Sequence, residues 1–246
     1  MNPFAKESKQ LSIFVTAGYP KIDSLGPQLQ LLSSKGVDFV EVGIPFSDPL
    51  ADGPVIQETS AVALENGMNL KLLFDQLKSI EPDLPLVLMG YLNPVMAYGL
   101  KPFLKDCQEC DIQAVILPDL SPEIYERFYQ NEFTKYGVSP VLLITPSSTE
   151  DRIRNAAKLC SNSFVYLVSS HSITGGASTW TEEQLKSFES IVSKCGNTPV
   201  FIGFGIRTKD DIRKVHSVCN GAIIGSAYLK ALEKGEETGF LDSLTK

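Results

Sequence analysis

Short runs of β-branched and aliphatic residues recur along the chain, and a polar residue or a glycine follows nearly every run. Apolar runs of this length, bounded by residues typical of turns, indicate strands that are buried on both faces, as in a parallel sheet. We therefore predict eight strands, at residues 11–16, 39–43, 86–90, 114–118, 141–145, 164–169, 200–203 and 221–225.

Segments with the apolar spacing of an amphipathic helix lie between these runs. After the first run, Leu25, Leu29 and Leu32 recur at intervals of three or four residues, which places them on one helix face. We expect each intervening segment to be a crossover helix that packs this face against the sheet.

The segment after the fourth run carries a start signal as well as an apolar face. Ser121 and Pro122 suit an N-cap and a first helical position, because serine can accept a bond from a free backbone N–H and proline needs no partner there. Ile124, Tyr125 and Phe128 follow with helical spacing. We predict a helix here that buries these three side chains.

The distance from one strand start to the next is mostly 21 to 36 residues, which is the length of a βαβ unit. Eight such units with right-handed crossovers close naturally into a barrel, and 246 residues suit that fold. We predict an α/β protein, a single (β/α)8 (TIM) barrel domain over residues 1–246. A doubly wound open sheet is the alternative.

Two segments are longer than a simple connection needs. The starts of the second and third strands are 47 residues apart, which predicts an extra helical segment after the second strand. Residues 170–179 are mostly small and polar, as a mobile lid over a barrel mouth would be. An ordinary surface loop is the alternative for the second segment.

Composition and charge exclude several classes of partner. Apolar residues make up 43% and charged residues 21%, as in ordinary globular proteins. The net charge of −7 offers no basic field for nucleic acid or an anionic membrane, so an anionic substrate would need local donors. The apolar run at residues 11–15 is too short for a signal peptide or a membrane span, so we expect a cytoplasmic protein.

Cysteine and histidine usage argues against a metal site. The five cysteines are expected to be free thiols, with a redox role left open for Cys107 and Cys110, which lie in a helix-like segment. His171 and His216 are the only histidines, too few for a histidine-rich zinc or iron site. We expect His216 to lie on a helix surface and the protein to bind no metal.

Glycines follow the last two predicted strands, where barrel enzymes commonly bind phosphate. The sequences are GFGI at residues 203–206 and GSA at 225–227. Glycine allows backbone N–H groups to approach an anion closely, and a helix that begins near Ser226 adds its positive end and a hydroxyl. We predict a phosphate site here, with tight turns of no ligand-binding role as the alternative.

Glu41 lies within the apolar run FVEVG, where an unpaired carboxylate is costly to ionise. Alternation places it on the same face as Phe39 and Gly43, pointing into the barrel. Its pKa should be raised, which suits acid–base chemistry near neutrality. A structural glutamate paired with a buried lysine or hydroxyl is the alternative.

Other chemistry-bearing residues are less decisive from pattern alone. Asp48 and Asp52 are candidates for catalysis, but Asp-Pro and Asp-Gly-Pro steps are also common in turns and caps. Phe14, Tyr91 and Tyr166 lie at or near strand ends and could line a pocket for a flat apolar group. Packing in the barrel core is their ordinary explanation.

A longer set of motifs resembles one known family. The segment FVEVGIPFSDPLADGPVIQ, at residues 39–57, is similar to the signature of the tryptophan synthase alpha chain. The family order continues over nearly the whole chain with FVTAGYP at 14–20, MGYLNP at 89–94, LPDL at 117–120, IGFGI at 202–206 and GSA at 225–227.

The resemblance implies a TIM barrel lyase that splits indole-3-glycerol phosphate into indole and D-glyceraldehyde 3-phosphate during L-tryptophan biosynthesis. It implies that Glu41 moves protons between the glycerol hydroxyl and indole C3, and that Asp52 holds the indole N–H. Thr174, on the lid, would meet Asp52 on closure. The remaining implied positions are Phe14, Tyr91, Ile116, Tyr166 and Ile223 around the substrate and Gly175, Gly205, Gly225 and Ser226 at its phosphate.

The resemblance also implies a beta subunit as partner, in an α2β2 assembly with an indole tunnel. Asp48 matches a residue that can bridge to that subunit. No cofactor is expected in this chain, since the pyridoxal phosphate of the complex belongs to the beta subunit. The chain departs from many relatives at Ser170, Ser172 and Phe164, which bears on lid closure and communication between subunits.

Three other functions remain open from the sequence. Another phosphate-binding barrel enzyme, such as indole-3-glycerol phosphate synthase or a sugar-phosphate epimerase, would need lysines or metal-binding histidines that these strand ends lack. A non-catalytic alpha chain would only activate a beta subunit, and the presence of Glu41 and Asp52 argues against it. A freestanding indole-releasing lyase would share the residues but have no partner.

Overall fold

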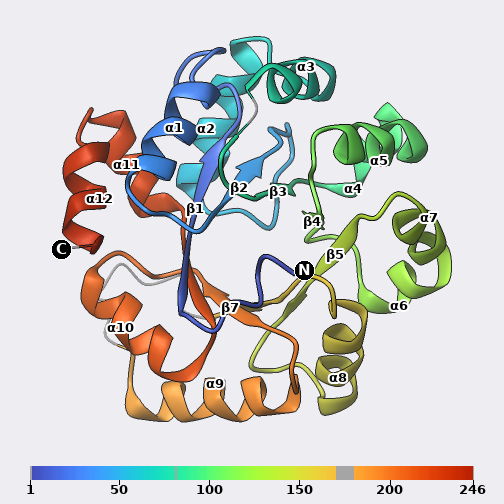
Figure 1. Cartoon of the computed structure of the whole chain (residues 1–246), viewed down its shortest axis with the longest axis vertical. Coiled ribbons are helices and arrows are strands. Elements are labelled where there is room, and N and C mark those ends of the chain that lie inside the picture. Colours follow the sequence, from blue (N-terminus) through green and yellow to red (C-terminus); the bar gives the residue numbers. More distant parts are fainter. Residues whose placement is uncertain (1, 81, 170–179, 246) are drawn as a thin grey trace.

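The computed structural model of the chain describes residues 2–80, 82–169 and 180–245. Eight parallel strands pair in chain order and β1 also pairs with β8, so the sheet closes on itself (Figure 1). The predicted barrel is confirmed and the open sheet is excluded. The strands are β1 Gln10–Thr16, β2 Phe39–Gly43, β3 Leu86–Met89, β4 Ala114–Ile116, β5 Ser139–Ile144, β6 Val165–Val168, β7 Val200–Gly203 and β8 Gly221–Ile224.

Prolines explain where strand boundaries differ from the prediction. β5 begins at Ser139, two residues before the predicted start, because its N–H donates to the carbonyl of Gln113 at 2.8 Å. Pro140 interrupts the apolar pattern but tolerates the strand conformation. β4 ends at Ile116 rather than at residue 118, because the chain turns after Leu117 at Pro118, which has no N–H for the ladder.

Helices surround the barrel on its outer side (Figure 1). Both α2 and α3 lie between β2 and β3, which confirms the predicted extra helical segment. The helices are α1 Leu25–Ser34, α2 Pro54–Glu65, α3 Leu70–Ile80, α4 Leu92–Tyr98, α5 Leu100–Glu109, α6 Pro122–Ile124, α7 Gln130–Lys135, α8 Glu150–Leu159, α9 Glu182–Lys194, α10 Lys209–Val218, α11 Ser226–Glu233 and α12 Glu237–Thr245, with a π-helical turn η1 at Tyr125–Tyr129.

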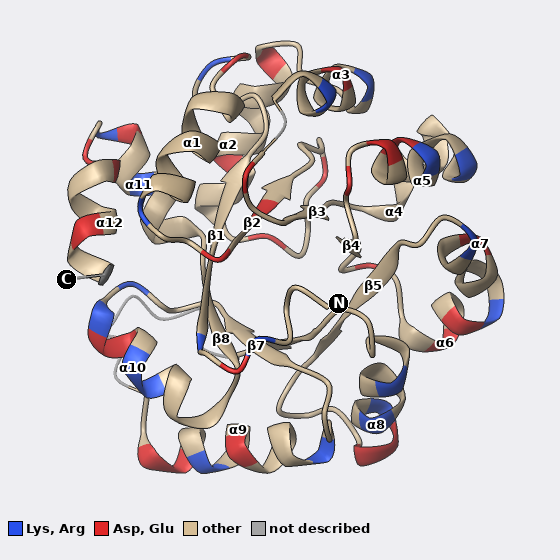
Figure 2. Cartoon of the chain, in the orientation of Figure 1, with Lys and Arg blue, Asp and Glu red and all other residues tan. Residues whose placement is uncertain are grey.

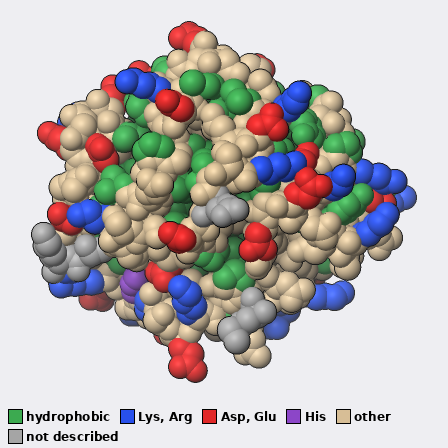
Figure 3. Space-filling view, turned by 45° about the horizontal axis from the view of Figure 1, so that its top comes forward, with side chains coloured by type: hydrophobic (Ala, Val, Ile, Leu, Met, Phe, Trp, Pro, Cys, Tyr) green, Lys and Arg blue, Asp and Glu red, His purple; other side chains and the backbone are tan. Residues whose placement is uncertain are grey.

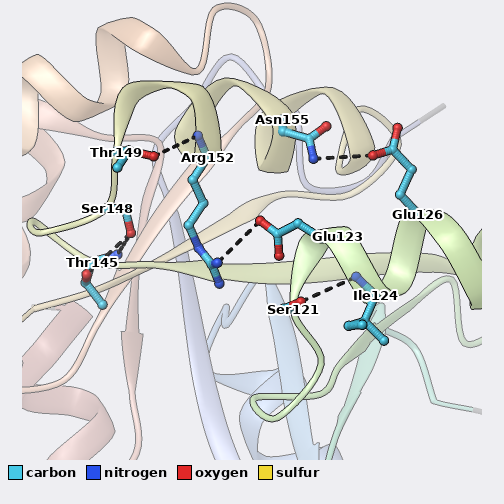
Figure 4. Close-up of polar contacts among 9 residues, drawn as sticks. All are labelled: Ser121, Glu123, Ile124, Glu126, Thr145, Ser148, Thr149, Arg152 and Asn155. Carbon is cyan, nitrogen blue, oxygen red and sulfur yellow. Dashed lines mark hydrogen bonds and ion pairs between the residues drawn. The ribbon is translucent and has the colours of Figure 1, made fainter.

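Side-chain caps fix the starts of the helices after β4 and β5 (Figure 4). Ser121 accepts a hydrogen bond from the N–H of Ile124 at 3.4 Å, and Pro122 is the first residue of α6, as predicted. At the start of α8, Thr149 accepts a bond from the N–H of Arg152. The Arg152 guanidinium reaches back across the two segments to Glu123 at 3.4 Å, so the caps and this ion pair hold neighbouring helices together.

The apolar face predicted after β4 is only partly correct. Tyr125 is buried, but Ile124 is 44% exposed and Phe128 is 60% exposed. Phe128 lies within the π-helical turn, whose backbone hydrogen bonds span one residue more than those of an α-helix, so the α-helical spacing does not predict which face it occupies. The guanidinium of Arg127 lies 5.0 Å from the centre of the exposed Phe128 ring.

An aromatic cluster fills the end of the barrel at which the strands begin. Phe4, Phe39, Phe164 and Phe201 are fully buried, and their ring centres lie 4.7 to 5.5 Å apart in edge-on or tilted contacts. This cluster fills the barrel interior at the N-terminal ends of the strands. The open end is therefore the one at which the strands finish, where barrel enzymes place their active sites.

Charged positions fall mainly on the outer helices and the loops (Figure 2). On the face drawn in Figure 3, side chains of both signs are interspersed, and neither sign forms a large field among the residues described. Within the described ranges, each helix is too short or too polar to cross a membrane.

Candidate active site

A cavity of about 590 Å³ opens where the strands end. Its walls combine apolar side chains with two carboxylates, two glycine-containing turns and the start of a helix. The lining residues are Phe14, Glu41, Leu50, Ala51, Asp52, Gly53, Pro54, Ile56, Met89, Tyr166, Phe204, Gly205, Ile206, Arg207, Ile223, Gly225, Ser226 and Ala227. A cavity of this size and mixed polarity suits a small organic ligand.

Glu41 reaches this cavity from the middle of β2. The strand alternation that points Phe39 into the aromatic cluster also points Glu41 inward, and its side chain is only 1% exposed. Burial raises the pKa of Glu41 to about 8. Its Oε1 atom makes no hydrogen bond within the described part of the chain, so the alternative of a paired structural glutamate is not supported there. The side chain is a carboxylic acid at neutral pH.

Asp52 comes from the loop between β2 and α2. A turn closed by the N–H of Asp52 on the carbonyl of Pro49, at 3.0 Å, brings it to the cavity. Burial raises its pKa to about 6, although a hydrogen bond from the Tyr91 hydroxyl, at 3.2 Å, acts in the opposite direction. Asp52 is thus mostly ionised at neutral pH while Glu41 is protonated.

Tyr91 holds Asp52 in place rather than lining the main cavity. Its hydroxyl donates to Asp52 and accepts from the N–H of Ala51 at 2.9 Å, so one phenol fixes both the backbone and the carboxylate of the loop. Tyr91 itself precedes α4, where both carboxylate oxygens of Asp119 accept from the N–H of Leu92 at 3.0 Å. The segment that follows β3 therefore holds the loop that follows β2 in position.

Removing the Tyr91 hydroxyl should raise the pKa of Asp52 above its present value of about 6, because the lost hydrogen bond stabilises the ionised carboxylate. The measurement is an NMR titration of the Asp52 carboxyl carbon in wild type and Tyr91→Phe. Tyr98→Phe is the matched control, since that hydroxyl bonds Asp106 instead. An unchanged or lowered pKa in Tyr91→Phe would contradict this arrangement.

Tyr166 and Phe204 form an aromatic part of the cavity wall. Tyr166 is buried in β6, and its phenol occupies the space that a Cβ atom on Gly203 would need. The Phe204 ring is edge-on to it, with ring centres 6.2 Å apart. Phe204 has φ of +72°, an uncommon conformation for a non-glycine residue, stabilised in part by Ser169, whose hydroxyl donates to its carbonyl at 3.1 Å.

The turns after β7 and β8 also line the cavity. Gly205 has φ of +78°, a conformation that favours glycine, and Gly225 is the N-cap of α11. Helix α11 begins at Ser226, as predicted, with Ser226 and Ala227 lining the cavity. Free N–H groups and the dipole of this helix end make the region suited to an anion.

The structure brings most of the sequence-predicted site residues together. Phe14 and Ile223 line the cavity, whereas Ile116 lines a small adjoining void with Asp52, Met89 and Tyr166. Thr174, Gly175 and the rest of the expected lid at residues 170–179 lie outside the described residues.

Asp48 is exposed on the loop after β2 and does not line the cavity. Its Oδ2 atom accepts a hydrogen bond from the Ser47 hydroxyl at 2.6 Å. Leu50, on the same loop, is 91% exposed. The loop thus presents an acidic and an apolar side chain to the outside.

Sequence reasoning missed several lining residues, among them Met89, Phe204 and Arg207. Phe204 lies inside the GFGI motif, so an aromatic side chain between two glycines was the available signal. Met89 ends an ordinary apolar run and Arg207 has the appearance of a surface residue. Nothing in the local pattern distinguishes these two from core and surface positions.

The cysteines and His216 play no visible part in this site. All five cysteines are free thiols, as predicted, and burial raises the pKa of Cys110 to about 11 and that of Cys107 well above its usual value, which disfavours a redox pair. His216 is half-buried rather than on the helix surface, because its ring lies against the start of β1, with Nε2 3.1 Å from the carbonyl oxygen of Gln10. Across the described ranges, no group of three or more histidine, cysteine or acidic side chains could hold a metal ion.

Comparisons with known proteins agree on one family. A family model described as "Tryptophan synthase alpha chain" matches residues 2–243. The tryptophan synthase alpha chain of Flavobacterium psychrophilum is 47% identical over 229 residues, covering 92% of this chain and 90% of the relative. That of Christiangramia forsetii is 42% identical over 231 residues, covering 93% and 90%.

Solved structures give the same result. The crystal structure of the tryptophan synthase alpha chain from Legionella pneumophila superposes with a TM-score of 0.88 at 26% identity, covering 100% of this chain and 96% of that one. A chain of tryptophan synthase from Mycobacterium tuberculosis, in an aminoacrylate-bound form, gives 0.82 at 26% identity, covering 97% and 92%. The chain belongs to the tryptophan synthase alpha chain family.

Proposed function

We propose that the chain is a lyase that cleaves indole-3-glycerol phosphate to indole and D-glyceraldehyde 3-phosphate, a step of L-tryptophan biosynthesis. Membership of the family supports this activity. The observation that carries the chemistry is the pairing in one cavity of Glu41, with a pKa of about 8, and Asp52, with a pKa of about 6. At neutral pH Glu41 is protonated and Asp52 is ionised.

In the proposed reaction, protonated Glu41 donates its proton to C3 of the indole ring, which turns the ring into a leaving group. Ionised Asp52 accepts a hydrogen bond from the ring N–H and stabilises the positive charge that develops on the indolenine. The Glu41 carboxylate then takes the proton of the hydroxyl on the adjacent glycerol carbon. The bond between that carbon and C3 breaks, its electron pair returns to the ring, and the aldehyde forms.

The rest of the cavity would bind the two ends of the substrate. Phe14, Tyr166 and Ile223 offer apolar and aromatic surface to the indole ring, and Phe204 extends it. The phosphate would bind the backbone N–H groups of the glycine turns and the Ser226 hydroxyl. The residues proposed for this end are Gly205, Gly225 and Ser226, together with Gly175 of the expected lid. Thr174 of the lid is expected to meet Asp52 on closure.

The proposed partner is a tryptophan synthase beta subunit in an α2β2 heterotetramer. Solved structures of tryptophan synthase from Mycobacterium tuberculosis contain a chain of this fold, and the loop with Asp48 and the exposed Leu50 offers a surface next to the cavity mouth. We propose that this chain needs no cofactor for its own half-reaction and that pyridoxal phosphate is confined to the partner. A cytoplasmic location fits a biosynthetic enzyme and remains part of this proposal.

The experiment that tests this function is indole release from indole-3-glycerol phosphate by the purified chain, with and without a beta subunit. Release that rises on adding the beta subunit supports both the reaction and the partnership. Release that is unaffected by the beta subunit indicates a freestanding lyase. An absence of release under both conditions would contradict the proposed function and favour a chain that acts only as an activator.

A further inference from the structure

Arg207 is a cationic residue of the cavity that the two glycine-containing turns line. It lines the cavity together with Gly205, Gly225 and Ser226, and it follows Gly205 by two residues. Among the described lining residues it is the only lysine or arginine, whereas the other titratable side chains there, Glu41 and Asp52, are carboxyl groups. Arg207 is thus the cationic residue of the described cavity lining.

The backbone of Arg207 is anchored while its side chain is exposed. The N–H of Arg207 donates to Oδ2 of Asp211 at 3.0 Å, and the same oxygen accepts from the N–H and the hydroxyl of Thr208. Asp211 is buried at the start of α10, so this bond fixes where the arginine leaves the turn. An arginine on an anchored backbone loses less freedom on binding than one on a mobile loop.

Within the described part of the chain, the Arg207 guanidinium forms no ion pair. The nearby acidic residue Asp210, in the first turn of α10, pairs with Lys214 at 2.9 Å. An exposed arginine that is not used by the fold, in a protein with a net charge of −7, is available to an anionic ligand.

We propose that Arg207 binds the phosphate group of the substrate and supplies the charged contact of a site otherwise made of backbone N–H groups and a hydroxyl. This inference rests on the proposed function, which provides a phosphorylated substrate. Guanidinium and phosphate form charge-assisted hydrogen bonds, often two in parallel. The phosphate is remote from the bonds that change, so this contact stabilises the bound substrate and the transition state equally. Its loss should therefore raise KM and leave kcat nearly unchanged.

The test is direct binding of rac-glycerol 3-phosphate, a probe of the phosphate end, and of indole, a probe of the apolar end, by calorimetry. Arg207→Ala should weaken glycerol 3-phosphate binding by about tenfold, the scale of one exposed charge-assisted contact, and leave indole binding within about twofold. Arg207→Lys should lose less affinity for glycerol 3-phosphate, because the positive charge remains and only the paired N–H donors of the guanidinium are lost. Arg213→Ala removes the same charge from the exposed side of α10 and should have no effect on either probe.

Steady-state cleavage separates this inference from the proposed function. The expected result for Arg207→Ala is a KM raised by about tenfold with a kcat within about threefold of wild type. Unchanged glycerol 3-phosphate binding in Arg207→Ala, or equal loss in Arg213→Ala, would overturn the role of Arg207 even if the wild type releases indole. Weakened binding in Arg207→Ala, in a wild type that releases no indole, would retain the anion contact and reject the reaction.

Discussion

Replacing Glu41 by glutamine is expected to reduce kcat for indole release by about a thousandfold, within the range attributed to a positioned general acid or base. The amide has nearly the shape of the carboxylic acid but cannot donate a proton to C3 or accept one from the glycerol hydroxyl. Because Glu41 is buried and its Oε1 atom makes no hydrogen bond in the described structure, the substitution removes proton transfer without breaking a structural pair. Indole release at saturating substrate measures the effect.

Glu65→Gln is the matched control, since Glu65 is exposed at the end of α2. We expect this variant to cleave at the wild-type rate and Glu41→Gln to keep its affinity for glycerol 3-phosphate. A Glu41→Gln enzyme that retains more than a tenth of the wild-type kcat would show that Glu41 does not carry the proton.

Asp52→Asn should reduce kcat by about a hundredfold, the lower end of the range for losing one group that stabilises a developing charge. The asparagine side chain can still accept the hydrogen bond from Tyr91, so the loop should keep its position. What is lost is the negative charge beside the ring nitrogen when the indolenine cation forms. The variant should therefore lose kcat with little change in the affinity for glycerol 3-phosphate.

Asp75→Asn, on the exposed side of α3, provides the matched control for this substitution. The same assay of indole release is made on both variants at one pH near 7. If Asp52→Asn instead raised KM and left kcat unchanged, Asp52 would be a binding group that does not distinguish the transition state from the substrate.

Alternation and spacing were enough to predict the barrel and the inward direction of Glu41. Both features follow from local geometry, since apolar runs form strands and every second side chain points the same way. The helix start at Ser226 was predictable for the same reason, because a glycine turn precedes an apolar helical segment. These properties are set by the neighbouring sequence and do not depend on distant contacts.

Asp52 and Tyr91 show where local pattern stops being informative. The sequence DGP is equally consistent with a turn, and Tyr91 with a core aromatic residue. Their roles depend on a contact between the loop after β2 and the end of β3, residues that are 39 positions apart. Such contacts exist only once the barrel closes, so composition and periodicity could not distinguish the alternatives.

Phe128 and Arg207 illustrate two further limits. The apolar pattern around Phe128 assumes an α-helical period, and the π-helical turn changes that period without a clear sequence signal. Arg207 has the appearance of an ordinary surface cation until the closed barrel places it in the lining of the same cavity as Gly225. Tertiary placement, rather than residue type, gives it a candidate role.

The pKa values of Glu41 and Asp52 together define a pH window for the reaction. Below about pH 6, Asp52 becomes protonated and loses the charge that stabilises the indolenine. Above about pH 8, Glu41 loses the proton that it must donate. Activity should therefore fall on both sides of this window.

The dependence of kcat/KM on pH, measured by indole release between pH 5 and pH 9.5 or roughly that range, tests the paired carboxylates most directly. We expect a bell-shaped profile with limbs near 6 and 8. The acid limb should move to higher pH in Tyr91→Phe, which titration of the substrate phosphate would not do. A rate that is constant across the range, or that continues to rise above pH 8, would contradict the assignment of protonated Glu41 as the proton donor and of ionised Asp52 as the group that stabilises the indolenine.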